Sequence, residues 1–260
     1  MSRTVPDYPH GKQLLAGKSA VITAAAGTGI GFWAARRFAE EGARLLISDL
    51  HPRRLEESAE KLAELTGVKP ATALCDVTQQ AQVDALRDAA LAALGSVDVL
   101  VNNAGLGGTA NLVDMTDAQW TKVLDVTLNG TMRVTRAFLP HMLARGSGAI
   151  VNNASVLGWR AQPGQSHYAA AKAGVMAFTR CVALEAAPSG VRINAVAPSL
   201  ALHEFLSKVT PDGLLEELEK REAFGRAAAP FEVANVMVFL ASDYASYMTG
   251  EIVAVSSQHP

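Results

Sequence analysis

From residue 19 onward, short apolar runs alternate with longer amphipathic segments. The runs are rich in β-branched residues, as strands are, and the segments between them are long enough for crossover helices. Strands are therefore expected at 20–23, 44–48, 72–75, 97–101, 149–153, 192–195 and 252–255. Helices are expected at 30–41, 52–65, 79–94, 119–143, 166–187 and 231–241.

This order of elements predicts an α/β fold, in which a single doubly wound domain places helices on both faces of a seven-stranded parallel sheet. We expect that domain over residues 16–260, without repeats or linkers. Residues 1–15 mix charged side chains with prolines and are expected to form a flexible arm. At 200–229 a separate polar helix interrupts the alternation, which predicts a flap over a binding site.

Composition narrows the class of protein. Of 260 residues, 49% are hydrophobic and 18% charged, which is typical of a soluble globular chain and excludes disorder. The net charge of −2 gives no basic surface for nucleic acid or an anionic membrane. The first fifteen residues show no signal peptide, and no apolar run is long enough for a membrane span. Two cysteines, Cys75 and Cys181, are too few for a disulfide framework and are expected in the core, so the sequence predicts a cytoplasmic protein.

The first expected strand runs into a glycine-rich turn that opens a helix. Glycines let the backbone approach a diphosphate, and the helix N-terminus offers free N–H groups at the positive end of its dipole. A tight strand-to-helix turn without a ligand has the same pattern, so both interpretations stay open on this feature. The candidate phosphate-binding residues are Gly27, Thr28, Gly29, Ile30 and Gly31.

A carboxylate, Asp49, follows the second expected strand. At this place in a dinucleotide-binding domain, a carboxylate accepts hydrogen bonds from the adenosine ribose. It also repels a 2′-phosphate, and neither Ser48 nor Leu50 offers a cation to hold one. The sequence therefore predicts NAD in preference to NADP. Asp76, after the third expected strand, keeps two interpretations, a helix cap and an adenine contact.

Tyr168 and Lys172 stand four residues apart on an expected helix, so their side chains share one face. Ser155 follows the fifth expected strand, at the edge where open α/β sheets bind ligands. Taking hydride from a carbinol carbon requires a base for its hydroxyl. An ammonium ~4 Å from a phenol is worth about 4 kcal/mol at an effective dielectric near 20, or about three pKa units before desolvation reduces the effect. A buried tyrosine beside a snorkelling lysine is the structural alternative.

Together these residues resemble the short-chain dehydrogenase/reductase family, over about residues 15–251. The likeness implies a Rossmann domain that transfers hydride at CH–OH groups, without a metal. It implies that Ser155 positions substrate, that Tyr168 is the acid/base, and that Lys172 lowers the tyrosine pKa and holds the nicotinamide ribose. The NAD-binding residues implied are Gly27, Thr28, Gly29, Ile30, Gly31, Asp49, Asp76, Val77, Asn103, Ala104, Gly105, Tyr168, Lys172 and Pro198.

Several positions depart from the family pattern. Ala24 stands where the first glycine of the turn is usual, and the turn is one residue longer. Thr127 takes the place of the asparagine that completes the family's catalytic group, and Asn129 lies two residues on, so either could serve the proton relay. His203 replaces a threonine and could face the cofactor, the substrate or solvent. The final segment 255–258 reads Val-Ser-Ser-Gln instead of Val-Asp-Gly-Gly.

Some stretches resemble a branch of the family that works in steroid catabolism and cholesterol degradation. The likeness implies NAD-dependent interconversion of a secondary alcohol and a ketone on an alicyclic, ring-derived acyl-CoA. Arg160 and Arg226 are candidate contacts for the anionic CoA. The stretches are 21–31, 151–162, 166–181 and 256–260.

Two other functions stay open at this point. One is a 3-oxoacyl-thioester reductase of the same family, and the other is a nucleotide-sensing interaction protein that binds the dinucleotide without turnover. Family likeness also implies a homotetramer, with the helices expected at 119–143 and 166–187 as contact surfaces.

Overall fold

The computed structural model describes residues 7–202 and 214–258. Within them one parallel sheet has the strand order β3-β2-β1-β4-β5-β6-β7, which confirms the seven-stranded doubly wound fold. Each strand lies within three residues of its expected bounds. The strands are β1 (Ser19–Ile22), β2 (Arg44–Asp49), β3 (Ala71–Leu74), β4 (Val99–Asn102), β5 (Gly148–Asn153), β6 (Val191–Pro198) and β7 (Ile252–Val255).

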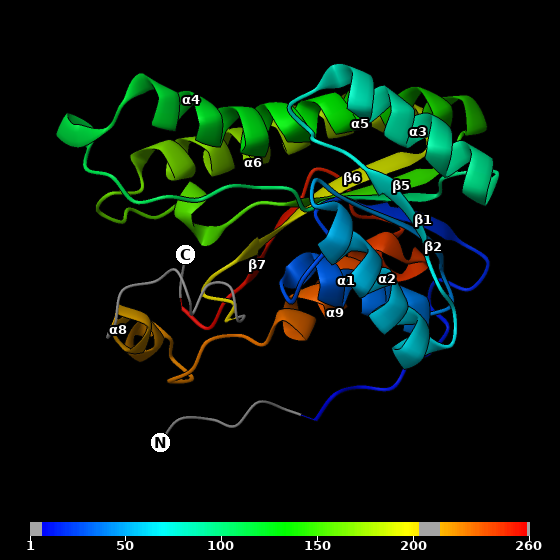
Figure 1. Ribbon diagram of the computed structural model, residues 1–260, viewed down its shortest axis with the longest axis horizontal. Helices are drawn as coiled ribbons and strands as arrows, with labels where there is room; N and C mark the ends of the chain where they lie inside the picture. The colour runs from blue at the N-terminus through cyan, green and yellow to red at the C-terminus, as the bar shows by residue number, and fades with distance from the viewer. Residues whose placement is uncertain (1–6, 203–213, 259–260) are drawn as a thin grey trace.

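Helices cover both faces of the sheet (Figure 1). One face carries α1 (Ile30–Glu40), α2 (Pro52–Thr66) and α9 (Pro230–Ala241), and the other carries α3 (Gln80–Leu94), α4 (Asp117–Leu124), α5 (Gly130–Arg145) and α6 (Ser166–Ala186). The helix α8 (Leu214–Arg221) lies apart from both layers. Short turns are η1 (Leu112–Asp114), η3 (Val156–Gly158), η4 (Ala187–Ser189) and η5 (Asp243–Ala245).

One expected helix is interrupted. The span expected at 119–143 consists of α4, a π-helical turn η2 (Asp125–Asn129) and α5. Hydrophobic periodicity follows the helix face and is blind to one widened turn, which is why the sequence did not show it. Such turns are frequent at functional sites, and this one contains Thr127.

The strands bury side chains on both faces, because helices lie above and below the sheet. In β1, Ile22 packs into the core on the α1 and α9 side, while Val21 packs into the core on the α3 and α5 side. β1 pairs in parallel with both β2 and β4. The sheet therefore extends from β1 in one direction through β2 and β3, and in the other direction through β4 to β7. The crevice where such sheets bind ligands therefore lies beyond the carboxyl ends of β1 and β4.

Buried amides connect the strands directly behind that edge. Asn102, at the end of β4, donates from Nδ2 to Oδ1 of Asn152 on β5 over 2.8 Å. Asn152 in turn donates from Nδ2 to Oγ1 of Thr179 on α6 over 2.9 Å. Because buried polar groups are costly unless they are paired, this chain fixes α6 relative to the ends of β4 and β5.

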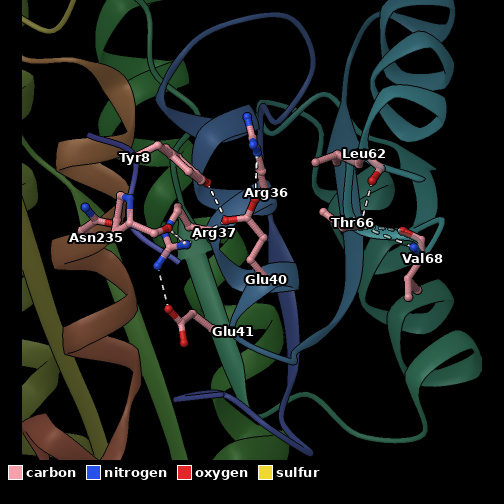
Figure 2. Close-up of polar contacts among 10 residues, drawn as sticks. Tyr8, Arg36, Arg37, Glu40, Glu41, Leu62, Thr66, Val68 and Asn235 are labelled. Carbon is pink, nitrogen blue, oxygen red and sulfur yellow. Dashed lines mark hydrogen bonds and ion pairs between the residues drawn. The ribbon is translucent and has the colours of Figure 1, made fainter. Parts of the chain in front are cut away.

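The described part of the amino-terminal segment, residues 7–15, contacts α1, which differs from the loose arm expected from the sequence. The Tyr8 hydroxyl donates to Glu40 over 2.6 Å, and the ring packs on Trp33 of α1 and Phe231 of α9. Figure 2 shows that Arg37, next to Tyr8, donates hydrogen bonds to Glu41 and Asn235. Burial and the bond to Glu40 raise the pKa of Tyr8 to about 12, so its hydroxyl stays a donor.

The structure also bears on the expectations for the two cysteines, for the segment expected as a flap and for membrane-spanning helices. Cys75 is buried as expected, whereas Cys181 is exposed, because the face of α6 that carries it is turned away from the sheet. The ends of the segment expected as a flap are held together by a parallel bridge between Ala201 and Ala228, and His203 lies outside the described residues. In the described ranges, we find no helix with the length and apolarity needed to cross a membrane.

Candidate active site

The glycine turn after β1 has the tight form that a diphosphate requires. Ala24 adopts a φ of 50° and Gly27 a φ of 92°, both in the left-handed region that favours glycine. A Cβ on Gly31 would lie 2.3 Å from the Ala24 carbonyl oxygen and 2.4 Å from Asn103 Nδ2. Only glycine fits at residue 31, and at residue 24 an alanine occupies a conformation for which glycine is the usual residue.

The first turn of α1 offers its N–H groups toward this loop. Gly29 is the N-cap, no side chain caps the helix, and its first turn holds no acidic residue. Uncapped N–H groups and the positive end of the helix dipole attract an anion. Thr28 and Ile30 are partly buried on either side of Gly29.

Two side chains from neighbouring elements hold the loop. Oδ2 of Asp49 accepts from the Ala26 amide over 3.3 Å, and Oγ of Ser58 on α2 accepts from the Gly27 amide over 3.0 Å. Sequence reasoning missed Ser58. Its signal was a small polar residue on the apolar face of an amphipathic helix, where it is 5% exposed.

Asp49 lies at the end of β2 and is 8% exposed. Burial raises the pKa of its carboxyl, while the bond from Ala26 and the charge of Arg54 act in the opposite direction. Its Oδ1 accepts from the His51 amide over 3.1 Å. The carboxylate is therefore fixed beside the loop, where it would meet the ribose of a bound dinucleotide.

Asp76 is neither free nor a helix cap. Its Oδ1 accepts from the Thr78 amide over 2.9 Å and from the Thr78 hydroxyl over 2.8 Å, and the N-cap of α3 is Gln79. The helix-cap interpretation was wrong because the N-cap, Gln79, lies three residues later and the helix begins at Gln80. The adjacent Val77 is buried, and its side chain would meet a Cβ placed on Gly130 at 2.7 Å.

Segment 102–105 closes the crevice from the β4 side. Thr23 Oγ1 accepts from the amides of Asn103 and Ala104 over 3.0 and 3.1 Å, and Asn103 Nδ2 donates to the Ala24 carbonyl over 2.9 Å. A Cβ on Gly105 would lie 3.4 Å from Lys172 Nζ. The uncapped helix, the close glycines and the buried carboxylate fit a nicotinamide dinucleotide along this edge.

The three candidate catalytic residues come together. Ser155 is the N-cap of η3, just beyond β5, and its side chain is hydrogen-bonded with Tyr168 of α6. One turn further along α6, Lys172 Nζ lies 5.5 Å from the centre of the Tyr168 ring. Lys172 is 3% exposed and donates to the carbonyl oxygen of Asn153 at the end of β5.

The pKa values differ from the expectation that Lys172 lowers that of Tyr168. Burial raises the pKa of the Tyr168 phenol, and the hydrogen bond with Ser155 offsets part of this rise. Burial also lowers the pKa of Lys172 to about 7. Near neutral pH the phenol is therefore protonated and only part of the amine is charged, because removal from water disfavours both charged forms.

Thr127 and Asn129, the two candidates for the missing relay residue, point to different partners. Thr127 is fully buried, accepts from the Leu106 amide over 3.0 Å and donates to the Leu106 carbonyl over 3.3 Å. Its hydroxyl would also lie 3.8 Å from a Cβ on Gly105. Asn129 instead donates to Asp125 over 3.0 Å. Of the two, Thr127 lies beside Gly105 in the crevice.

The two candidate CoA-binding arginines have protein partners. Arg226 forms two bonds with the carboxylate of Glu232, at 2.7 and 2.8 Å, so its charge is largely neutralised. Arg160 donates to the side chain of Gln258. Pro198 is buried at the end of β6, paired with Val255 of β7, and borders the same edge.

Comparison with known proteins decides the family. Residues 24–257 match the family model described as enoyl-(acyl carrier protein) reductase. A short-chain dehydrogenase from Mycobacterium smegmatis has a crystal structure that superposes with a TM-score of 0.88, at 54% identity and 99% coverage of both chains. The chain belongs to the short-chain dehydrogenase/reductase family. It is accordingly an oxidoreductase with the Rossmann-type fold of that family, whose members use nicotinamide cofactors.

Relatives with named activities cover nearly the whole chain. A Mycobacterium tuberculosis protein, (5R,7aS)-5-hydroxy-7a-methyl-1-oxo-2,3,5,6,7,7a-hexahydro-1H-indene-carboxyl-CoA reductase, is 60% identical over 98% of both sequences. A 3-oxoacyl-[acyl-carrier-protein] reductase from Chlamydia muridarum is 37% identical over 93% of this chain and 97% of its own. The structure of levodione reductase superposes with a TM-score of 0.89 at 34% identity, covering 94% of this chain and 97% of its own.

Proposed function

We propose that this short-chain dehydrogenase/reductase interconverts a ring hydroxyl and a ketone on an alicyclic, steroid-ring-derived acyl-CoA with NAD as cofactor. The observation that carries the substrate class is 60% identity, over 98% of both chains, to the reductase that acts on a hexahydroindene carboxyl-CoA. The reaction class rests on the family and on the meeting of Ser155, Tyr168 and Lys172 beside the crevice.

The catalytic roles follow from the chemistry of the three side chains. The Tyr168 hydroxyl is placed to give a proton to a carbonyl oxygen in the direction of reduction, or to take the hydroxyl proton in the direction of oxidation. Ser155 polarises the same substrate oxygen through its hydrogen bond. A bound nicotinamide dinucleotide supplies or accepts the hydride. Lys172 places a partly charged amine behind the phenol.

We propose reduction as the working direction, and the protonation state of Tyr168 is compatible with it. Burial keeps Tyr168 protonated at neutral pH, which is the form that donates a proton to a developing alkoxide. Oxidation instead needs the phenolate, whose formation burial opposes. The relative that is 60% identical is also a reductase by name.

The choice of NAD over NADP rests on Asp49. Its buried carboxylate is held at the glycine turn by the Ala26 amide, in the place where a 2′-phosphate would meet negative charge. We further propose a cytoplasmic homotetramer, with α4, α5 and α6, which cover the face of the sheet opposite α1, as contact surfaces. The absence of a membrane-spanning helix among residues 7–202 and 214–258 is compatible with that placement.

The 3-oxoacyl-thioester reductase is the second candidate, because a relative with that activity is 37% identical over 93% of the chain. It is less favoured, since the hexahydroindene carboxyl-CoA reductase is 60% identical to this chain. A non-catalytic nucleotide sensor is disfavoured by the assembled catalytic residues.

The test measures oxidation of NADH and NADPH at 340 nm with three carbonyl compounds. These are an alicyclic keto acyl-CoA, acetoacetyl-CoA, and a bicyclic ketone without CoA. We expect the alicyclic CoA thioester and NADH to give the highest kcat/KM. Preference for acetoacetyl-CoA would establish the second candidate, and dinucleotide binding without turnover of any of the three would establish a sensor.

A further inference from the structure

The carboxyl-terminal tail, residues 256–258, follows β7 and has no part in the site described above. It lies beside the end of α8 at the carboxyl edge of the sheet (Figure 1). In the strand order, β7 is two places from β5, which leads to Ser155, and five from β2, which ends in Asp49. The tail is therefore on the substrate side of the crevice.

Gln258 bridges a cation and an anion. Its Oε1 accepts from Nη1 of Arg160, and its Nε2 donates to Oε1 of Glu222 over 2.8 Å. A primary amide accepts at one end and donates at the other, whereas a carboxylate only accepts and an ammonium only donates. Glutamine is therefore suited to both partners at once, and the bridge fixes the orientation of its amide.

Glu222 depends on the tail. It lies one residue after α8 and is 4% exposed. Its second oxygen accepts from the Ser257 hydroxyl over 2.7 Å, so both carboxylate oxygens are bound by the tail. A buried carboxylate is costly unless it is hydrogen-bonded. The need of Glu222 for these two donors therefore fixes the position of the tail.

The other end of the bridge reaches the catalytic loop. Arg160 donates its amide to the Val156 carbonyl over 2.9 Å, and Ser155 is the N-cap of the turn that Val156 begins. The Arg160–Gln258–Glu222 chain of contacts, called the tail bridge here, thus connects the Ser155 loop to the segment after α8. These two segments border the carboxyl ends of β5, β6 and β7.

We propose that the tail bridge is a substrate-positioning device that fixes the Ser155 loop relative to the α8 segment and so sets the opening for a ring-shaped acyl-CoA. This inference rests on the proposed function and adds a specificity determinant to it. Gln258 is a positioning residue, because it acts on Ser155 through Arg160 and contacts none of the reacting groups. The tail bridge leaves the dinucleotide side of the crevice untouched.

The test replaces Gln258 with glutamate, which puts a second carboxylate against Glu222. For the alicyclic keto acyl-CoA we expect KM to rise about tenfold, in the range of a lost charge-assisted hydrogen bond. We expect kcat to stay within about threefold and the Kd for NADH, from its fluorescence, to stay within about twofold. In the double variant Glu222→Gln/Gln258→Glu the two groups are exchanged: the carboxylate at residue 258 still accepts from Arg160, and the amide at residue 222 supplies the donor that the single variant lacks. This double variant is expected to recover the wild-type KM.

Gln80 supplies a matched control. On α3 it accepts from Arg136 over 2.6 Å and donates to Asp84 over 3.0 Å, so it bridges a cation and an anion in the same way. It is the first residue of α3, the helix that follows β3, and β3 is six places from β7 in the strand order. Gln80→Glu is expected to leave KM unchanged.

The outcomes separate the hypotheses. A KM for Gln258→Glu equal to that of Gln80→Glu overturns the inference, as does a parallel loss of NADH affinity or a double variant that recovers nothing. If Gln258→Glu does not fold, Gln258→Ala and Ser257→Ala are measured in its place against the same limits. Failure of the proposed function is visible separately, because wild-type protein would then not reduce the alicyclic thioester.

Discussion

The two halves of the crevice are held together by different kinds of contact. On the dinucleotide side, side chains bind backbone amides: Asp49 binds Ala26, Ser58 binds Gly27, and Thr23 binds Asn103. On the substrate side, side chains bind one another through the tail bridge, and a buried amine is held by a carbonyl.

The difference shows what each half has to specify. A diphosphate is recognised by the course of the backbone, so the contacts there shape a loop. A particular ketone is recognised by side chains, so the contacts there depend on which polar groups meet. Substitutions should accordingly divide into those that change cofactor parameters and those that change carbonyl parameters. Variants of Tyr168, Lys172 and Asp49 test this division.

The largest expected effect is that of Tyr168→Phe. Removal of the phenol proton should lower kcat/KM for the ketone by about 10³-fold, the middle of the range for general acid catalysis. The Kd for NADH should change by less than about twofold, because phenylalanine keeps the aromatic ring at residue 168 and removes only the hydroxyl. A variant that kept more than about a tenth of the wild-type activity would remove Tyr168 from the mechanism.

Lys172→Met should separate activity from stability. We expect kcat to fall by about 10²-fold. The melting temperature at pH 7 should rise by ~2–4 °C, or about 1 kcal/mol, because an apolar side chain replaces a buried amine. Circular dichroism melts check the second effect against wild type in the same buffer.

The difference in stability between Lys172→Met and wild type should shrink as the pH rises above 7. Burial lowers the pKa of Lys172 from 10.5 to about 7 in the folded protein. Below pH 7 the amine is protonated in both the folded and unfolded states, so the cost of burying its charge is fully present. Between pH 7 and 10.5 the unfolded chain binds more protons, and wild-type stability gains on the variant as the pH rises. An advantage of Lys172→Met that grew above pH 7 would contradict the burial effect.

Asp49→Ala tests the dinucleotide side. Loss of a charge-assisted hydrogen bond to the ribose predicts a drop in kcat/KM for NADH of about tenfold, with a smaller change or a gain for NADPH. The KM for the ketone should not move. Asp49→Asn is the control, since its amide oxygen can still accept from Ala26 without the negative charge, and its cofactor preference should be intermediate.

The smallest effect is expected from Ala24→Gly. Ala24 has a φ of 50°, which costs an L-residue about 1 kcal/mol and glycine nothing, while glycine adds entropy to the unfolded chain. The net change in the free energy of unfolding should lie between zero and about +0.5 kcal/mol, measured by urea titration. Gly31→Ala is the opposite case and should destabilise strongly, because its Cβ would lie 2.3 Å from the Ala24 carbonyl oxygen.

Hydrophobic periodicity was enough to predict the sheet and the helix layers. The strands carry short β-branched runs, and Asp49, Asn103 and Ser155 could be placed because parallel strands end at one edge. The pairing of Tyr168 with Lys172 was also visible, since i and i+4 side chains share a helix face.

What the sequence could not show depends on contacts between distant residues. Ser58 and Gln258 act only through partners more than 30 residues away, and no local pattern marks them. The pKa directions at Tyr168 and Lys172 were missed because sequence spacing gives the attraction between two charges, whereas the size of the opposing desolvation depends on how deeply the fold buries them.

The position of Tyr8 has a consequence for both halves. Its ring touches Trp33 of α1, the helix that begins at the phosphate turn, and Phe231 of α9, the helix that precedes β7 and the tail. One aromatic side chain thus contacts both the helix that begins at the dinucleotide side of the crevice and the helix that leads to its substrate side. Trp33 is a natural fluorophore at this contact, and its emission offers a probe of whether ligand binding on one side of the crevice changes the structure on the other.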